Sequence, residues 1–322
     1  MDLATSDNRS SFTFVDADGW EIFVRCWRPA DGLPKGVVQI VHGVADHSGR
    51  YDRFARFLNA AGYIVYANDH RGHGNTAKVR SKFGIAGHDG WNAMVRDLKQ
   101  LSDLVRSEHP RLPLFLFAHS LGSLMAQQYL QNWGGELRGA ILSGTLGSLT
   151  NLDERLAMIE PQAVGETAER ASAVFTALQA SFNKPFELSG ETWLDWLSRD
   201  VEEVRKYVAD PFCRVAVCNQ LAAEILREAK HIWSDERESQ IPRELPLLLI
   251  AGDADPVGEN TASVQALIDR YRGHGITKIA SKFYPDARHE LLNELNREEV
   301  QQDVLNWLEA HRSPYQRPPQ RP

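Results

Sequence analysis

One stretch of ten residues, Phe115 to Leu124, constrains the fold of this chain more than any other. It runs from an apolar, strand-like segment into a helix-like segment, with small residues at the join. A serine on such a strand-to-helix turn is held in a strained conformation that exposes its hydroxyl and places backbone N–H groups beside it. The stretch therefore predicts a nucleophile elbow with Ser120 at its tip. Taken alone, it fits equally well a buried strand and a helix that Ser120 caps.

The glycine pattern around Ser120 departs slightly from the usual elbow, Gly-x-Ser-x-Gly. Side chains two residues before and after the serine would collide across the tight turn, which is why glycine is usual there. Gly122 keeps the pattern, whereas Ala118 replaces the first glycine. A methyl group is the smallest possible departure, so the elbow remains the prediction to be tested against the rest of the chain.

Strand-like apolar runs alternate along the chain with segments of helical periodicity. The dipeptide Asp18-Gly19 favours a tight turn, so an antiparallel hairpin is expected over 12–27. Nearly continuous apolar runs are typical of strands buried on both faces of a parallel sheet. They occur at 36–41, 63–67, 115–118, 139–143 and 246–252, with a weaker strand at 279–284, and helices are expected at 54–61, 91–105, 260–272, 300–308 and after Ser120. We therefore expect an α/β fold with a mostly parallel, eight-stranded sheet flanked by helices.

The alternation stops between residues 148 and 242, where helical periodicity continues without a strand candidate. We interpret 148–242 as a helical cap, or lid, inserted after the sixth strand into a core made of 1–147 and 243–312. The insertion carries 17 acidic and 10 basic side chains, which a solvated helical face explains. The tail 313–322 contains four prolines and two arginines and is expected to be disordered.

Composition excludes several classes of function. The net charge of -7 gives no reason to expect nucleic-acid binding. The chain shows neither a secretory signal at its start nor an apolar run approaching the roughly 20 residues of a membrane span. Three scattered cysteines, Cys26, Cys213 and Cys218, are too few for a disulfide framework or a zinc cluster. We expect free thiols and a cytoplasmic location.

Two further segments carry residues that a serine nucleophile needs. A serine hydroxyl reacts at neutral pH only with a base in hydrogen-bond reach and a carboxylate to orient that base. In this architecture both lie on loops after later strands, in the order serine, acid, histidine. Asp255 follows the strand 246–252, and His289 follows the strand 279–284. Residue type, position and chain order agree, so we predict a triad of Ser120, Asp255 and His289.

The oxyanion formed in acyl transfer also needs hydrogen-bond donors. One is commonly the backbone N–H after the nucleophile, and another comes from the loop after an early strand. The backbone N–H groups of Leu121 and of Val44, which follows His42-Gly43 at a strand end, are the candidates.

A metal site is an alternative to the triad, because several possible ligands follow strand ends. They are His42, His47, Asp69, His70, His73 and His119. The motif Asp-His-x-x-His resembles part of a binuclear metallohydrolase site, but further spaced ligands are missing. We therefore expect no metal and no cofactor, and interpret the segment 69–74 as loop scaffolding held by side-chain to backbone hydrogen bonds.

The motifs together resemble the monoacylglycerol lipase and lysophospholipase branch of the α/β-hydrolases. They are His42-Gly43-x-x-Asp46-His47-Ser48-Gly49-Arg50-Tyr51, Asp69-His70-Arg71-Gly72-His73-Gly74, Ala118-His119-Ser120-Leu121-Gly122, Gly252-Asp253-Ala254-Asp255-Pro256-Val257 and Ala287-Arg288-His289-Glu290. The resemblance implies that Asp255 rather than Asp253 is the triad acid and that 148–242 shapes an acyl pocket. Ala118, Asp46 and Ser123 depart from residues usual in the family, and none of these changes removes a catalytic group.

The sequence thus predicts a serine esterase that works through an acyl-enzyme on a small-molecule ester. A lipid monoester, such as a monoacylglycerol or a lysophospholipid, is the preferred substrate, with only transient contact with lipid. The alternatives are a short-chain or non-lipid carboxylesterase, a thioesterase or an aminopeptidase on the same triad, and a hydrolase-fold binding protein without catalysis. The cap aromatics Phe175, Phe182, Phe186, Trp193, Trp196 and Trp233 could line an acyl tunnel, although helix packing is expected for most of them.

Overall fold

The computed structural model describes residues 9–188 and 192–312. The predicted disordered tail 313–322 lies outside the described residues. The sheet strands are β1 (Arg9–Val15), β2 (Glu21–Trp27), β3 (Gly36–Val41), β4 (Tyr63–Asn68), β5 (Leu114–His119), β6 (Gly139–Ser143), β7 (Leu247–Gly252) and β8 (Ile279–Tyr284). The α-helices are α1 (Asp52–Ala60), α2 (Gly74–Ala77), α3 (Gly90–Glu108), α4 (Leu121–Trp133), α5 (Leu152–Ile159), α6 (Ala173–Ser181), α7 (Val201–Ala209), α8 (Asn219–Ile232), α9 (Asp235–Glu238), α10 (Ala262–Gly273) and α11 (Arg297–His311).

The eight strands form a single sheet in the order β1-β2-β4-β3-β5-β6-β7-β8. β1 pairs with β2 and β2 with β4 in antiparallel register, whereas every later pair is parallel. The predicted hairpin turn is present, and Gly19 adopts a φ of 83° that suits glycine. The expectation of a mostly parallel, eight-stranded α/β fold is confirmed.

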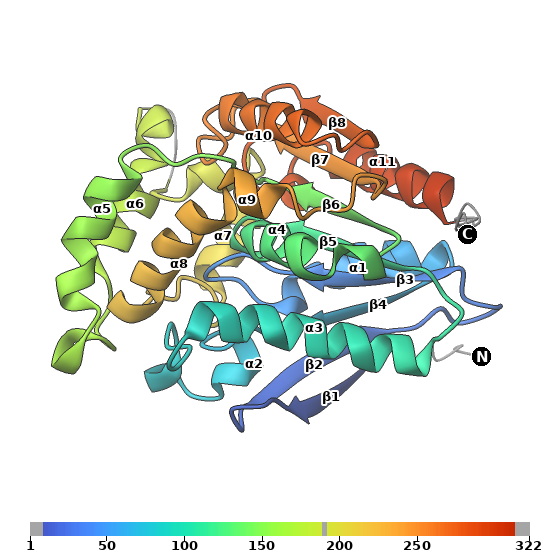
Figure 1. Cartoon of the computed structure of the whole chain (residues 1–322), viewed down its shortest axis with the longest axis horizontal. Coiled ribbons are helices and arrows are strands. Elements are labelled where there is room, and N and C mark those ends of the chain that lie inside the picture. Colours follow the sequence, from blue (N-terminus) through green and yellow to red (C-terminus); the bar gives the residue numbers. More distant parts are fainter. Residues whose placement is uncertain (1–8, 189–191, 313–322) are drawn as a thin grey trace.

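Helices cover both faces of the sheet (Figure 1). Side chains of α1 and α11 join one buried cluster with strand residues such as Phe117 and Ile250. Side chains of α3, α4 and α10 join a second cluster on the opposite face. Because β3 to β7 are buried along their whole length, their apolar runs are continuous, as the sequence indicated.

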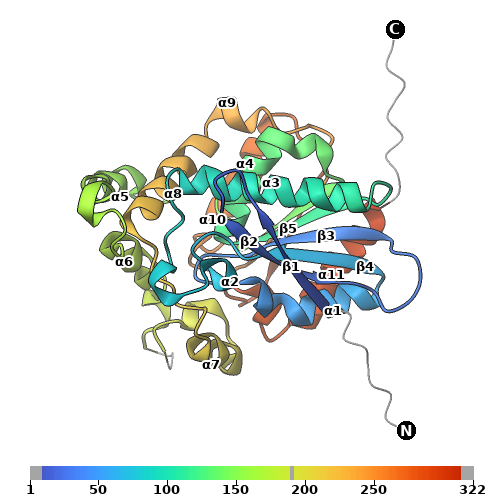
Figure 2. The same ribbon diagram turned by 90° about the horizontal axis from the view of Figure 1, so that it is seen from below.

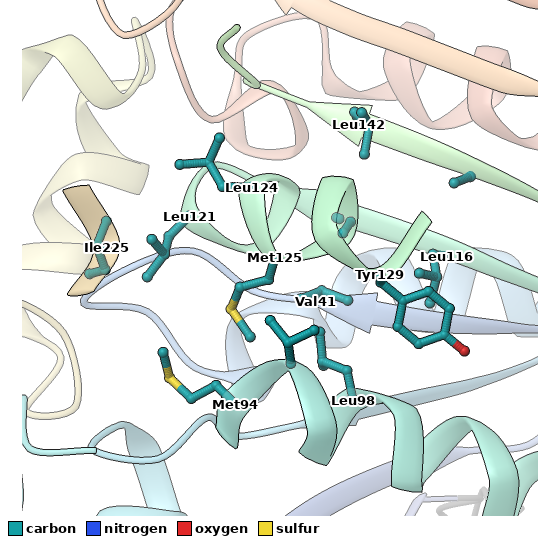
Figure 3. Close-up of a cluster of buried hydrophobic side chains, with 14 of the residues drawn as sticks. Val41, Met94, Leu98, Leu116, Leu121, Leu124, Met125, Tyr129, Leu142 and Ile225 are labelled. Atoms are coloured by element: carbon teal, nitrogen blue, oxygen red, sulfur yellow. The ribbon is translucent and has the colours of Figure 1, made fainter. Parts of the chain in front are cut away.

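Figure 3 shows the second cluster where α4 packs against the sheet and beside α3. Met125 of α4 reaches toward Met94 and Leu98 of α3, and all three side chains are fully buried. A fully buried Leu or Met side chain stabilises the fold by about 1.5–3 kcal/mol relative to an exposed one. This packing fixes the helix that begins directly after Ser120, and hence the orientation of the elbow.

Between β6 and β7 the described chain forms helices, apart from an isolated bridge between Ala171 and Cys218. Figure 2 shows α5, α6, α7 and α8 gathered at one side of the sheet, where the parallel strands end. Side chains cap several of these helices, such as Asp200, which accepts hydrogen bonds from two N–H groups at the start of α7. Within the described ranges, none of the helices combines the length and apolar character needed to cross a membrane.

Most differences from the predicted elements are at their ends. β1 begins at Arg9 rather than at residue 12, and α11 begins at Arg297 rather than at residue 300. Both extensions are largely polar, so the apolar periodicity did not include them. The short helix α2 was not predicted, because its four residues are too few to show a helical period.

Candidate active site

Ser120 lies between β5 and α4 with a φ of 53° and a ψ of -123°. Few residues other than glycine adopt a positive φ, so the surrounding structure must hold this conformation. The Ser120 N–H donates to the Ser143 carbonyl at 3.0 Å, which ties the turn to the end of β6. The Ser120 side chain makes no helix-capping hydrogen bond, so the alternative interpretation as a helix cap is wrong.

Gly122 allows the turn to close. A Cβ atom on this residue would lie 2.4 Å from the carbonyl oxygens of both Val41 and His42. These are backbone atoms in and beside the central strand β3 and cannot move aside cheaply. Ala118, in contrast, is a fully buried residue of β5, so its methyl group is accommodated there. The second glycine of the elbow pattern is therefore required here, and the first is not.

The structure brings Ser120, His289 and Asp255 together from three separate loops. His289 Nε2 lies 2.8 Å from Ser120 Oγ, and His289 Nδ1 lies 2.9 Å from Asp255 Oδ2. With Nδ1–H donating to the carboxylate, Nε2 is free to accept the proton of the serine hydroxyl. Asp255 is fully buried, and its second oxygen accepts a hydrogen bond from the Val257 N–H at 2.9 Å.

A segment of the helical insertion holds the loop that carries His289. The His289 N–H donates to the Trp196 carbonyl at 3.3 Å, and the Glu290 N–H donates to the Leu197 carbonyl at 2.7 Å. The ring of Trp196 lies 5.1 Å from that of His289. Arg288 donates to the Asp195 carbonyl at 2.5 Å. These contacts link 195–197 to the loop that carries His289, here called the histidine loop. No local sequence pattern predicted them.

The two predicted oxyanion donors lie beside Ser120. Leu121 is the first residue of α4, so its N–H has no acceptor within the helix. The N–H of Val44 donates to no backbone carbonyl of the described chain. The next residue, Ala45, has a φ of 56°, and its carbonyl accepts a hydrogen bond from Tyr207 Oη at 2.9 Å. Tyr207 belongs to α7, so the helical insertion also holds this loop.

A buried ion pair lies next to these loops. Arg50 donates to both carboxylate oxygens of Glu290 at 2.7 Å and to Asp46 at 3.2 Å. Burial opposes the ionisation of Asp46 and Glu290. The Arg50 guanidinium, aided at Asp46 by His47 and at both acids by His119, outweighs burial, so the pKa of both carboxyl groups is lowered. Asp46 also accepts a hydrogen bond from Tyr51 Oη at 2.9 Å. Arg50 thereby connects the loop that carries Val44 and Asp46, here called the oxyanion loop, to Glu290, the residue that follows His289.

Two of the possible metal-ligating histidines, His42 and His70, form hydrogen bonds with each other. The His70 N–H donates to His42 Nε2 at 3.0 Å, and the ring Nε2–H of His70 donates to the His42 carbonyl at 3.0 Å. His42 Nδ1 lies 2.8 Å from the Gly43 carbonyl. Burial and the neighbouring histidines lower the pKa of His42 and His73, and lower that of His70 to about 3. They are neutral scaffolding that supports the oxyanion loop.

One group of three possible metal ligands exists in the described part of the chain: His47, Asp210 and Cys213. His47 Nδ1 accepts a hydrogen bond from the Gly49 N–H at 3.2 Å, so Nε2 carries the proton and donates to Asp210 at 3.0 Å. A metal would need the lone pair that this proton occupies. Burial raises the pKa of the Cys213 thiol, which disfavours the thiolate form that binds metals. All three cysteines are free and buried.

A cavity of about 200 Å³ lies over Ser120, between the oxyanion loop, the histidine loop and the helical insertion. Apolar side chains form much of its wall, including Trp193, Leu194, Trp196, Leu197 and Val215. Of the six cap aromatics considered above, Trp193 and Trp196 line the cavity, whereas Phe175, Phe182, Phe186 and Trp233 pack in or against the core cluster. Helix packing is therefore confirmed as the role of most of them.

The family model described as serine aminopeptidase, S33, matches residues 32–296. The chain belongs to this hydrolase family. Among relatives, it is 30% identical to a monoacylglycerol lipase of Mycolicibacterium smegmatis, over 95% of this chain and 99% of that protein. It is 28% identical to the human monoglyceride lipase, over 87% of this chain and 84% of that protein.

Solved structures that are similar to this chain agree with this assignment. A thermostable carboxyl esterase from Bacillus coagulans superposes with a TM-score of 0.88 at 29% identity, covering 94% of this chain and 99% of that one. A monoglyceride lipase variant from Saccharomyces cerevisiae, at 18% identity, has a TM-score of 0.73 over 95% of this chain and 96% of that one, which supports the α/β-hydrolase fold. The predicted resemblance is confirmed, and the protein is an ester-hydrolysing enzyme of this family.

Proposed function

We propose that this hydrolase cleaves lipid monoesters, with Ser120 as nucleophile, His289 as general base and Asp255 as the acid that orients it. The observation that carries the proposal is the unbroken hydrogen-bond chain from Ser120 Oγ through His289 to Asp255, opening onto a mainly apolar cavity. The relatives named as monoacylglycerol and monoglyceride lipases support the choice of a monoacyl ester as substrate.

The reaction follows from the hydrogen-bond directions. His289 Nε2 takes the proton of Ser120 as Oγ attacks the ester carbonyl, and the tetrahedral intermediate forms. Asp255 stabilises the imidazolium that results. His289 then gives the proton to the leaving alcohol, and the acyl-enzyme remains. Water, activated by the same histidine, attacks the acyl-enzyme and releases the fatty acid.

The N–H groups of Val44 and Leu121 would stabilise the negative oxygen of the tetrahedral intermediate. Loss of one oxyanion donor costs on the order of 10²–10³ in kcat in serine hydrolases. Backbone donors are fixed by loop conformation. Tyr207 and the Arg50 ion pair hold the loop of Val44, and the bond from the Ser120 N–H to Ser143 holds the turn before Leu121. His119, whose pKa is lowered to about 4 by burial and by His289, is neutral beside them.

The size of the cavity bears on the substrate. Its volume of about 200 Å³ is smaller than the roughly 300–1,000 Å³ of sites that enclose drug-sized ligands. A long acyl chain would need additional room, which displacement of the insertion could provide. We propose that 148–242 acts as a cap and that its outer helices move, while 195–197 stays with the histidine loop.

The predicted cytoplasmic location and transient lipid contact stay predictions.

The charges at the cavity argue against an aminopeptidase. Such an enzyme must bind the ammonium group of its substrate, usually with a free carboxylate. The acids lining the cavity, Asp46 and Glu290, are both occupied by Arg50. An ester without a positive charge suits these walls better.

Substitution of Ser120 by alanine tests the proposal. We expect Ser120→Ala to lose the fluorophosphonate labelling of the wild type and to lower kcat on a monoacylglycerol by about 10⁵-fold or more, with unchanged far-UV circular dichroism. A profile over acyl chains of increasing length would distinguish a lipid monoesterase from a short-chain carboxylesterase. Retained activity of Ser120→Ala, or labelling at another serine, would contradict the assignment.

A further inference from the structure

Arg214 lines the cavity above Ser120, and among the residues that the structure describes its side chain has no hydrogen-bond or ion-pair partner. We propose that it makes the enzyme selective for monoacyl esters whose alcohol carries a phosphate group. The inference rests on the proposed function, because it concerns which ester enters the cavity that Ser120 faces. It distinguishes between the two lipid monoesters expected from the sequence, a monoacylglycerol and a lysophospholipid, and so assigns the alcohol side of the substrate.

Arg214 is held in place by its neighbours in the connection between α7 and α8. Cys213 and Val215, on either side, are each 5% exposed. The Cys213 N–H donates to the Asp210 carbonyl at 3.2 Å, and the Val217 carbonyl accepts a hydrogen bond from the Ser172 N–H at 2.9 Å. Arg214 itself has a φ of 59°. This conformation costs an arginine roughly 1–2 kcal/mol, so the flanking contacts must hold it.

Arg214 is exposed, and no acid of the described chain compensates its charge. Within residues 9–188 and 192–312, its guanidinium makes no ion pair and donates no hydrogen bond. The acids on the same wall, Asp46 and Glu290, are held by Arg50, and nearby Asp210 is held by His47. Gln179 lines the same cavity, and its side-chain amide is likewise without a hydrogen-bond partner among these residues. The wall therefore offers donors that lack an acceptor.

A phosphate fits such a wall better than a neutral glycerol does. The guanidinium presents a planar fork of N–H groups that can bind two phosphate oxygens at once. A phosphomonoester carries about -1.5 to -2 charges at pH 7, so its attraction to Arg214 exceeds that of a hydroxyl. The whole chain has a net charge of -7, which repels anions at long range. A positive group at the cavity is thus the local feature that would favour an anionic substrate.

The experiment compares a 1-monoacylglycerol with the 3-phosphate of the same compound, both with a medium-length acyl chain and below their aggregation concentrations. The quantity measured is the selectivity, the ratio of kcat/KM for the phosphate ester to kcat/KM for the neutral ester. Arg214→Gln should lower this ratio by about 10- to 100-fold, as expected for loss of a charge-assisted hydrogen bond. Arg214→Lys should keep part of it, because the charge remains and the fork is lost.

Arg170→Gln is the matched control. Arg170 also lies in the insertion, is exposed, and its side chain has no partner in the described chain, but it does not line the cavity. Its removal changes the net charge equally and should leave the ratio at the wild-type value.

Three results would overturn the proposal. The first is a ratio in Arg214→Gln within twofold of wild type, which is the result expected for a merely solvated arginine. The second is an equal fall in Arg170→Gln, which would assign the effect to net charge. The third is Arg214-dependent inhibition by inorganic phosphate with an unchanged ester ratio, which would mean a site for free phosphate. None of these affects ester hydrolysis by Ser120, which the Ser120→Ala variant tests separately.

Discussion

Arg50 lies between two buried carboxylates, and its replacement by methionine should destabilise the protein much more at pH 7 than at pH 5. The side chains of Asp46 and Glu290 are 4% and 8% exposed, and that of Arg50 is 13% exposed. Methionine keeps much of the volume but removes the cation. Breaking a buried ion pair by removing one partner typically costs 3–5 kcal/mol. We expect about 4 kcal/mol at pH 7.

Protonation of the two acids sets the pH dependence. In the wild type their pKa values are lowered, so the stability that they contribute is present above their ordinary values and is lost only as the pH falls through the native ones. Without Arg50, burial alone would raise both pKa values, and the penalty would be relieved as the pH falls. In the variant, each acid can escape this penalty by binding a proton. From the ordinary pKa values of 3.8 for Asp46 and 4.5 for Glu290, protonation costs about 4 and 3 kcal/mol at pH 7. At pH 5 the two costs fall to about 1.6 and 0.7 kcal/mol.

Urea unfolding followed by tryptophan fluorescence at pH 7 and pH 5 measures this difference. The gap in unfolding free energy between wild type and Arg50→Met should shrink from about 4 kcal/mol at pH 7 to about 2 kcal/mol at pH 5. Arg56→Met is the control, because Arg56 is half exposed in its pair with Asp52 and should cost under about 1 kcal/mol at either pH. A gap of equal size at both pH values would refute the reasoning, since it would mean that the lost contribution is packing rather than charge.

Two other predictions concern the site itself. Asp255→Asn should lower kcat by about 10³- to 10⁴-fold with little change in KM, because the amide cannot stabilise the imidazolium of His289. Steady-state kinetics on a monoacyl ester would check this. A loss in kcat below tenfold would argue against the role of Asp255. Gly122→Ala should destabilise the protein by about 3 kcal/mol or more in the same urea assay, because its Cβ would meet two backbone oxygens at 2.4 Å. Gly135→Ala, where the added Cβ meets nothing within 4 Å, should change stability by less than about 1 kcal/mol, and equal effects of the two substitutions would contradict this account of the elbow.

The order of strands and helices could be predicted because it is written in local patterns. Continuous apolar runs identify strands that are buried on both faces, and five of them, β3 to β7, are fully buried in the structure. Ser120, Asp255 and His289 each follow a strand of the parallel part of the sheet. Since parallel strands end at one edge, chain order alone was enough to predict that these residues meet.

The helical insertion shows where local pattern stops being informative. Its periodicities predicted helices, but the bonds from Trp196 and Leu197 to the histidine loop join backbone groups that are more than 90 residues apart. Any residue can supply a backbone N–H or carbonyl, so such contacts leave no mark on the sequence. Only the tertiary structure distinguishes the part of the insertion that braces the site from the part that could move.

The sequence by itself thus determined the sheet, the elbow and the three residues that meet there, because strand burial and turn geometry restrict residue type locally. The tertiary structure decided which charges are paired. Arg50 and Glu290 are 240 positions apart, and their pairing leaves Arg214 as a cation without a partner at the cavity, within the residues described. Long-range ion pairs depend on how the loops pack, and a charged residue looks the same in the sequence whether it is paired or free.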